Sequence, residues 1–208
     1  MRKAIQETMN FIPRALILSR LMIGIVIVSI SYRQVGHYKT FAVILLAIGL
    51  LTDIFDGIIA RRLNISNVNF RRFDSAADQF FFLCIVGATY IQSPAFYQDN
   101  WIPLSLLGLA ELTTYLVSYG KFRKEVATHA LSSKIWTLIL FSTLIQLILT
   151  NDSTVLFQCC FYTGIITRME IIAILLILNE WTNDVPSVFH AIRLRQGKTI
   201  RRHKLFNG

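Results

Sequence analysis

Residues 38–60 read YKTFAVILLAIGLLTDIFDGIIA. The stretch is apolar for most of its length, and a helix needs about 20 such residues to cross the hydrocarbon core of a bilayer. Near its end it carries Asp53 and Asp56. Charged groups are costly inside a membrane and mark functional sites there. The stretch therefore predicts a membrane-spanning helix that carries part of a site.

Five other segments have the same length and character: 15–32, 74–93, 100–119, 131–150 and 154–179. Apolar residues make up 54% of the chain, charged residues 16%, and the mean hydropathy is +0.53, whereas an average globular chain is ~25% charged. Six such runs leave too little polar surface to cover a soluble core. The sequence predicts an all-α polytopic protein with six transmembrane helices in a single domain, residues 1–208.

Three other classes of chain do not fit the composition. A disordered chain would have far less apolar material. A disulfide framework is excluded because Cys84, Cys159 and Cys160 are odd in number and lie in apolar runs. A cleaved signal peptide is disfavoured because Arg20 interrupts the first run and five more runs follow.

The basic residues orient the spans. Of the 21 Lys and Arg residues, 16 fall in the termini and in the two connections on the same side of the predicted membrane. The opposite loops carry only Arg33 and Lys39. Cytoplasmic loops are enriched in Lys and Arg, so both termini are predicted to be cytoplasmic, in a multi-pass protein of the inner membrane if the source is bacterial.

Both ends of the chain have the pattern of segments that lie on a membrane surface. Residues 1–13 carry apolar side chains at helical spacing before Pro13, and a similar stripe, Val185, Val188, Phe189 and Ile192, begins the basic segment 183–208. These patterns predict short interfacial helices. A basic tail is also compatible with nucleic-acid binding, but no other feature supports that partner, and attraction to anionic lipid headgroups explains the charge.

Two pairs of acids distinguish this chain from a simple bundle of spans. Asp53 and Asp56 are three residues apart, and Asp74 and Asp78 are four apart, so each pair shares one helix face. Four carboxylates at one depth would repel one another unless a cation lay among them, and hard oxygen ligands suit Mg²⁺ or Mn²⁺. Asp74 taken alone could instead be a helix N-cap.

The acids belong to a longer pattern, D53-I-F-D56-G57-I-I-A60-R61 followed by Phe70, Asp74 and Asp78. This pattern resembles the signature of the CDP-alcohol phosphatidyltransferases, D-x2-D-G-x2-A-R-x8-G-x3-D-x3-D. Phe70 replaces the second glycine, which affects the entry to the third helix. Residues 12–20, IPRALILSR, resemble the opening I-P-N-x-L-T-x-x-R of the family, with Arg14 and Ile17 as departures.

The resemblance implies an enzyme of phospholipid biosynthesis that transfers a phosphatidyl group from CDP-diacylglycerol to an alcohol and releases CMP. It implies Mg²⁺ or Mn²⁺ at Asp53, Asp56 and Asp74, with Asp78 as the base that takes the acceptor's proton and as a further metal ligand. Gly57, Ala60 and Arg61 would bind the nucleotide. The resemblance also implies a homodimer with its active site on the cytoplasmic side.

Three cations inside or at the ends of spans are candidates for binding the acceptor or a phosphate: Arg20, Lys134 and Arg168. Arg20 could bind the diphosphate, whereas Lys134 and Arg168 favour a phosphorylated polyol, such as glycerol 3-phosphate, as acceptor. Each has a structural alternative. Arg20 could pair with an acid, Lys134 could follow the charge bias of cytoplasmic ends, and Arg168 could pair with Glu111 or Glu170.

Two other functions are compatible with parts of the sequence. The loss of the second glycine is compatible with an inactive family member that serves as a scaffold. Buried acids are also found in cation transporters, but those sites lie near the bilayer midplane between repeats, and here the acids are at one edge and no repeat is visible. Metal-dependent release of CMP separates the enzyme from both alternatives.

Overall fold

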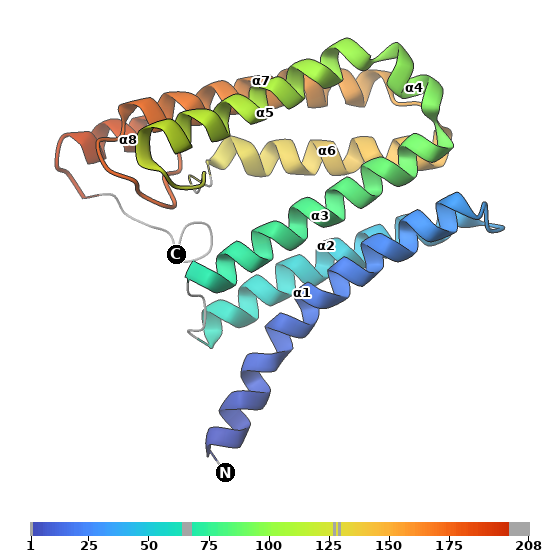
Figure 1. The fold of residues 1–208 in the computed structure, drawn as a ribbon, viewed down its shortest axis with the longest axis horizontal. Coiled ribbons are helices and arrows are strands. Elements are labelled where there is room, and N and C mark those ends of the chain that lie inside the picture. The colour runs from blue at the N-terminus through green and yellow to red at the C-terminus, as the bar shows by residue number, and fades with distance from the viewer. Residues whose placement is uncertain (1, 64–67, 127, 129, 200–208) are drawn as a thin grey trace. The chain divides into compact units, whose positions relative to one another are not determined.

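The computed structural model describes residues 2–63, 68–126, 128 and 130–199, and describes side chains for 12–59, 63, 70, 73–126, 128 and 130–199. Within these residues every regular element is a helix, and no strand is present. The helices are α1 (Arg2–Tyr32), α2 (Tyr38–Arg62), α3 (Val68–Gln92), α4 (Pro94–Asp99), α5 (Trp101–Phe122), α6 (Leu131–Thr150), α7 (Thr154–Ile177) and α8 (Val188–Arg195) (Figure 1). The all-α prediction is confirmed for this part of the chain.

Each of the six predicted spans corresponds to a long helix, but only five of the described helices are long and apolar enough to cross a membrane. These five spans are Ile12–Tyr32, Tyr38–Ile59, Trp101–Phe122, Leu131–Thr150 and Thr154–Ile177. The remaining helix, α3, carries Asp74 and Asp78 in its first half and ends with Gln92. These polar residues lower its apolar character, so the structure supports a multi-pass membrane protein with five candidate spans, and the sixth stays a prediction.

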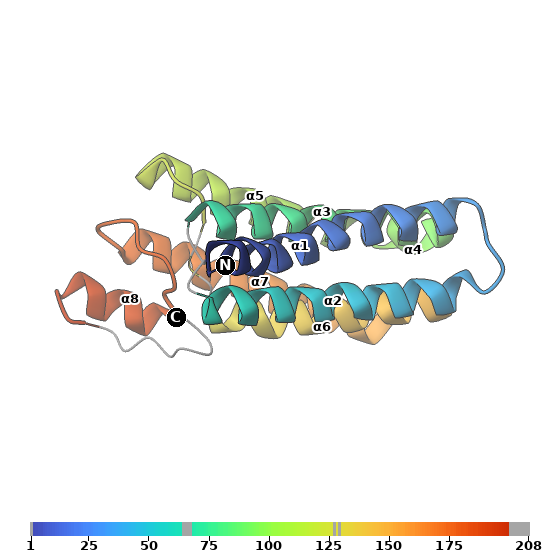
Figure 2. The ribbon, with the colours of Figure 1, turned by 90° about the horizontal axis from the view of Figure 1, so that it is seen from below.

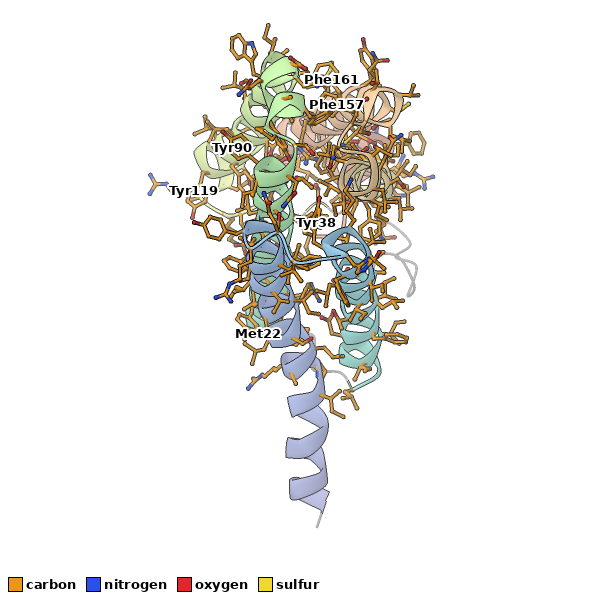
Figure 3. The ribbon with its side chains drawn as sticks, turned by 90° about the vertical axis from the view of Figure 1, so that its right-hand side faces the viewer. Met22, Tyr38, Tyr90, Tyr119, Phe157 and Phe161 are labelled. Atoms are coloured by element: carbon orange, nitrogen blue, oxygen red, sulfur yellow. The ribbon has the colours of Figure 1, made fainter. Side chains whose placement is uncertain are left out.

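The outer surfaces of the span helices are apolar, as lipid contact requires. Met22 of α1 is 61% exposed, and Tyr90 of α3 and Tyr119 of α5 are also exposed. Figure 3 shows these side chains projecting away from the ribbon. A soluble protein would not present so many large apolar side chains to water.

The chain divides into two compact units. The first comprises Met1–Phe96 and Leu144–Asp152, and the second comprises Tyr97–Thr143 and Ser153–Gly208. The sequence predicted one domain over residues 1–208. The division into two compact units does not test whether they form one domain, so this stays a prediction.

In the first unit, α1 packs against both α2 and α3, and Figure 2 shows it between them. Small residues allow the close approach, since a Cβ on Gly24 would lie 3.2 Å from Cys84 Cβ. At the end of α1 the Ser31 hydroxyl donates to the Ala88 carbonyl (2.9 Å), and the Gln92 amide donates to the Ser31 carbonyl (2.6 Å). These contacts fix α1 against α3, which determines where Arg20 lies.

The N-terminal residues do not form a separate helix. Residues 2–13 continue into the first span as a single helix that contains Pro13, and Figure 1 shows α1 bending in its first half. A proline inside a helix removes one backbone hydrogen bond and kinks the helix without ending it. The interfacial location predicted for residues 1–13 stays a prediction.

The second unit contains α5, α7, α8 and most of α6. Its core is formed by Ala130, Ile171, Ile174, Leu175, Leu178, Val185 and Ala191. The predicted C-terminal stripe is divided, because Val185 is buried in this core whereas Phe189 and Ile192 of α8 are exposed. Residues 200–208 of the predicted basic tail lie outside the described residues.

Candidate functional site

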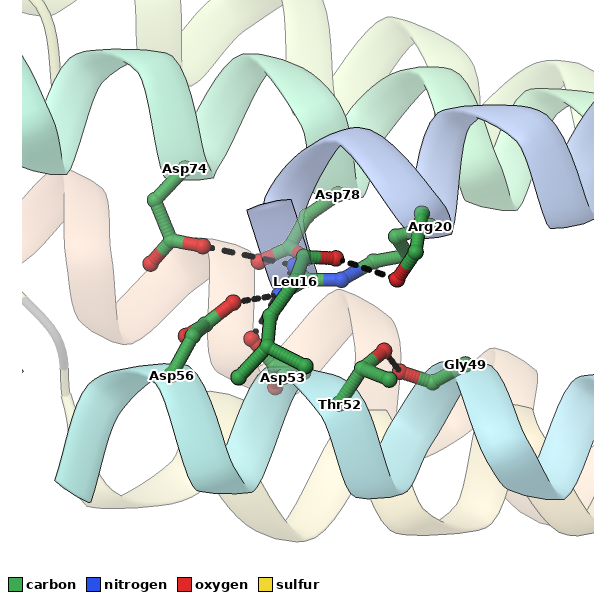
Figure 4. A network of polar contacts seen from close by, with 9 residues as sticks. Leu16, Arg20, Gly49, Thr52, Asp53, Asp56, Asp74 and Asp78 are labelled. Carbon is green, nitrogen blue, oxygen red and sulfur yellow. Dashed lines mark hydrogen bonds and ion pairs between the residues drawn. The ribbon is translucent and has the colours of Figure 1, made fainter. Parts of the chain in front are cut away.

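The four predicted acids converge on one arginine. Asp53 and Asp56 lie on α2, Asp74 and Asp78 lie on α3, and Arg20 extends from α1 into the space between them (Figure 4). The three- and four-residue spacings place each acid pair on the face of its helix that meets α1. The predicted convergence of the four acids is therefore present in the structure.

Arg20 forms an ion pair with each acid. Its Nη1 atom lies 3.1 Å from Asp53 Oδ1 and 3.3 Å from Asp74 Oδ1. The same nitrogen pairs with Asp78 Oδ1, and Nη2 pairs with Asp56 Oδ2. The sequence presented Arg20 as a phosphate ligand or as the partner of an acid, and in the structure it is the partner of all four.

The cluster has a buried side and an open side. Arg20 and Asp56 are 1% and 0% exposed, whereas the side chains of Asp53, Asp74 and Asp78 are 38%, 27% and 36% exposed. A buried charge is tolerated only when it is paired and hydrogen-bonded. The exposed edges leave three carboxylates accessible to a ligand.

Three of the acids could hold one metal ion. Asp53, Asp56 and Asp74 each offer a carboxylate oxygen, and these oxygens lie within 4.8 Å of one another. Asp56 Oδ1 is buried and has no hydrogen-bond partner. An all-carboxylate donor set is the chemistry that Mg²⁺ and Mn²⁺ prefer, and an unsatisfied buried oxygen is the kind of atom that a cation satisfies. Asp78 lies in the Arg20 cluster but outside this three-oxygen group.

The predicted nucleotide-binding residues are only partly described. Gly57 follows Asp56 directly on α2 and is half-buried. The side chains of Ala60 and Arg61 lie outside the described residues, so their predicted roles stay predictions.

Phe70 replaces the second glycine of the motif, and it lies in the first turn of α3. Phenylalanine adopts helical backbone angles without strain. Phe70 therefore places a large side chain one turn before Asp74. The backbone stays helical from Phe70 through Asp74 and Asp78.

Residues 10–187 match the family model for CDP-alcohol phosphatidyltransferases. The match covers most of the 208 residues, including α2, α3 and all four acids. The chain belongs to the CDP-alcohol phosphatidyltransferase family. Neither a curated protein nor a solved structure matches it. Membership supports a membrane transferase of this class, and members typically use a divalent metal.

The second unit of this phosphatidyltransferase contains the other two candidate cations. Arg168 of α7 is buried, pairs through Nε with Glu111 Oε2, and lies 4.2 Å from the centre of the Trp136 ring. Pairing with Glu111 was one of the predicted alternatives. Sequence reasoning missed Trp136, because it lies 32 positions before Arg168 and no spacing signal connects a tryptophan to an arginine on another helix.

Lys134 lies in the first turn of α6. Near it, the hydroxyl oxygens of Thr128 and Ser132 are buried and have no hydrogen-bond partner. Two backbone N–H groups of this first turn are already paired, that of Leu131 with the Pro186 carbonyl and that of Ser133 with the Ala130 carbonyl. The positive end of the helix dipole also lies here and favours an anion. This end of α6 therefore has the chemistry of an anion site.

Proposed function

We propose that this protein transfers a phosphatidyl group from CDP-diacylglycerol to an alcohol acceptor and releases CMP, in phospholipid biosynthesis. The observation that carries the proposal is the convergence of four carboxylates from α2 and α3, three of which offer oxygens within 4.8 Å of one another. Family membership supports the reaction class.

The reaction forms a bond between the acceptor oxygen and the phosphatidyl phosphorus, and breaks the bond from that phosphorus to the oxygen of the CMP phosphate. Asp53, Asp56 and Asp74 would hold Mg²⁺ or Mn²⁺, which supplies charge neutralisation of the diphosphate and of the departing CMP. Asp78 takes the proton of the acceptor hydroxyl. Its partly exposed side chain supports this role, because an acceptor must approach the base within hydrogen-bond distance.

The remaining roles follow the family resemblance. Gly57 allows close approach of the cytidine, Ala60 forms the wall beside it, and Arg61 binds a phosphate of the nucleotide. Arg20 adjoins all four acids and so can also donate to the diphosphate. We further propose a homodimer, with both termini and the active site on the cytoplasmic side, in agreement with the Lys and Arg bias.

For the acceptor we propose a phosphorylated polyol such as glycerol 3-phosphate. Lys134 at the start of α6 is the main candidate for its phosphate, because the neighbouring buried hydroxyls have no partner. Arg168 is the weaker candidate, because Glu111 and Trp136 already engage its guanidinium. Activity with serine and none with a phosphorylated polyol would refute this choice of acceptor.

The test is CMP release by the purified protein in lipid, with CDP-diacylglycerol, Mg²⁺ or Mn²⁺, and a panel of acceptors. We expect acceptor-dependent CMP that disappears with a chelator. Asp78→Asn is expected to bind the CDP donor and to lose turnover, whereas the control Asp99→Asn, at the exposed end of α4, keeps it.

The other outcomes separate the alternatives. Retained turnover in Asp78→Asn would refute the base assignment. Donor binding without CMP release by the unmodified protein would indicate an inactive scaffold, and failure to bind the donor at all would favour the transport function.

A further inference from the structure

The contacts of Arg20 give this residue a role beyond binding phosphate. Its guanidinium is buried and contacts Asp53 Oδ1, Asp56 Oδ2 and Asp74 Oδ1. These residues are the same three that offer the grouped oxygens of the metal site. One positively charged side chain of α1 therefore pairs with all three carboxylates that a divalent cation would need.

The arginine is held in this place by the packing of α1. Ile17, one turn before it, is fully buried, and Gly24, one turn after it, leaves no room for a larger side chain against Cys84. Because the backbone of α1 is fixed between α2 and α3, the guanidinium can leave the acids only by a change of rotamer. The packing of α1 therefore keeps the charge of Arg20 close to the acids.

Two opposing effects follow from this geometry. The arginine lowers the repulsion among four carboxylates, which stabilises the fold when no other cation balances them. It also repels a divalent cation a few ångströms away and competes with it for the same oxygens, which weakens metal binding. Asp56 Oδ1, which is buried and has no hydrogen-bond partner, is one oxygen that the arginine leaves to the metal.

We propose that Arg20 is the built-in counter-ion of the carboxylate cluster, which holds α2 and α3 together at the site and sets the affinity of the metal by competing for its ligands. Arg20 acts through the acids and is a positioning residue. The inference rests on the proposed metal site but is independent of the transfer reaction.

The experiment uses the full chain, purified in lipid, and compares the unmodified protein with Arg20→Gln. Binding of Mn²⁺ is measured from the loss of the free-ion electron paramagnetic resonance signal, and thermal unfolding is followed in chelator and at saturating Mn²⁺. We expect Arg20→Gln to unfold at a lower temperature in chelator, to bind Mn²⁺ about tenfold tighter or more, and to gain more stability from the metal.

The matched control is Arg168→Gln, which removes another buried arginine paired with an acid. It should lose stability in chelator with unchanged Mn²⁺ affinity. Arg20→Lys provides a second variant if Arg20→Gln does not fold. Its single ammonium cannot contact four acids together, so its Mn²⁺ affinity should also rise, by a smaller factor.

Mn²⁺ affinity that is unchanged or weaker in both Arg20 variants would overturn the counter-ion role while leaving the metal site in place. An unmodified protein that binds no Mn²⁺ would refute the metal site and the counter-ion role together. Neither outcome depends on CMP release.

Discussion

Replacing Gly49 by alanine tests whether helix packing sets the geometry of the acid site. A Cβ at this position of α2 would lie 2.9 Å from Cε2 of the Phe81 ring on α3, whereas ordinary contact begins at 3.4 Å. Phe81 is buried, so its ring can move aside only by displacing other side chains. The Phe81 Cζ atom would lie closer still, so the ring and α2 must separate by more than the 0.5 Å that the Cε2 contact alone requires. Overpacking of this kind costs about 1–3 kcal/mol.

The same displacement reaches the carboxylates. Gly49 lies four residues before Asp53 on α2, and Phe81 lies three residues after Asp78 on α3, so the clash is one turn from the acids on both helices. Metal–oxygen distances tolerate only about 0.2 Å of change. We expect Gly49→Ala to lower Tm by several degrees, at roughly 2–4 °C per kcal/mol, and to weaken Mn²⁺ binding by about tenfold.

Thermal unfolding and Mn²⁺ titration of the protein in lipid measure both effects. The control is Gly87→Ala on α3, where an added Cβ meets nothing within 4 Å. Alanine has the higher helix propensity, so this variant should unfold at or above the temperature of the unmodified protein. The reasoning is refuted if Gly49→Ala matches the unmodified protein in both Tm and Mn²⁺ affinity.

Two predictions concern the second unit. Gly164→Ala would place a Cβ 2.6 Å from Trp136 Nε1 and 2.7 Å from Leu107 Cδ2. We therefore expect the free energy of unfolding to fall by about 1–3 kcal/mol, measured by thermal unfolding. An unchanged Tm would show that the indole can move. Lys121→Met removes an ammonium that donates to the last carbonyls of α7, at 3.0 Å for Leu175. The last turn of α7 should lose about 1 kcal/mol of stability or less, so its amide hydrogens should exchange faster. Unchanged exchange would argue against a stabilising role for the Lys121 ammonium at this helix end.

The positions of the helices were predicted well because their signal is local. Runs of about 20 apolar residues separated by polar stretches determine where spans begin and end, and α6 was predicted at 131–150, its observed range. The N-terminal boundary was less predictable. Pro13 was expected to divide a surface helix from a span. The helix instead runs from Arg2 to Tyr32, because a proline about three turns into a long helix bends it without ending it.

Pairs of residues within one helix were predictable for the same reason. The sequence shows that Asp53 and Asp56 share a face, as do Asp74 and Asp78, because helical spacing alone fixes that relation. It does not show which residues of other helices meet those faces. Arg168 and Trp136 illustrate this limit, since their contact depends on how α6 and α7 approach within the second unit.

By itself the sequence determined the class of the protein, its apolar helices, the metal-type donor set and the family to which it belongs. Each of these follows from residue type and from spacing along the chain. Only the tertiary structure decided that Arg20 pairs with all four acids, that Asp56 is buried while Asp53, Asp74 and Asp78 remain partly exposed, and that α1 lies between α2 and α3. The physical reason is that packing between helices depends on side-chain shape at positions far apart in the chain, which no local pattern encodes.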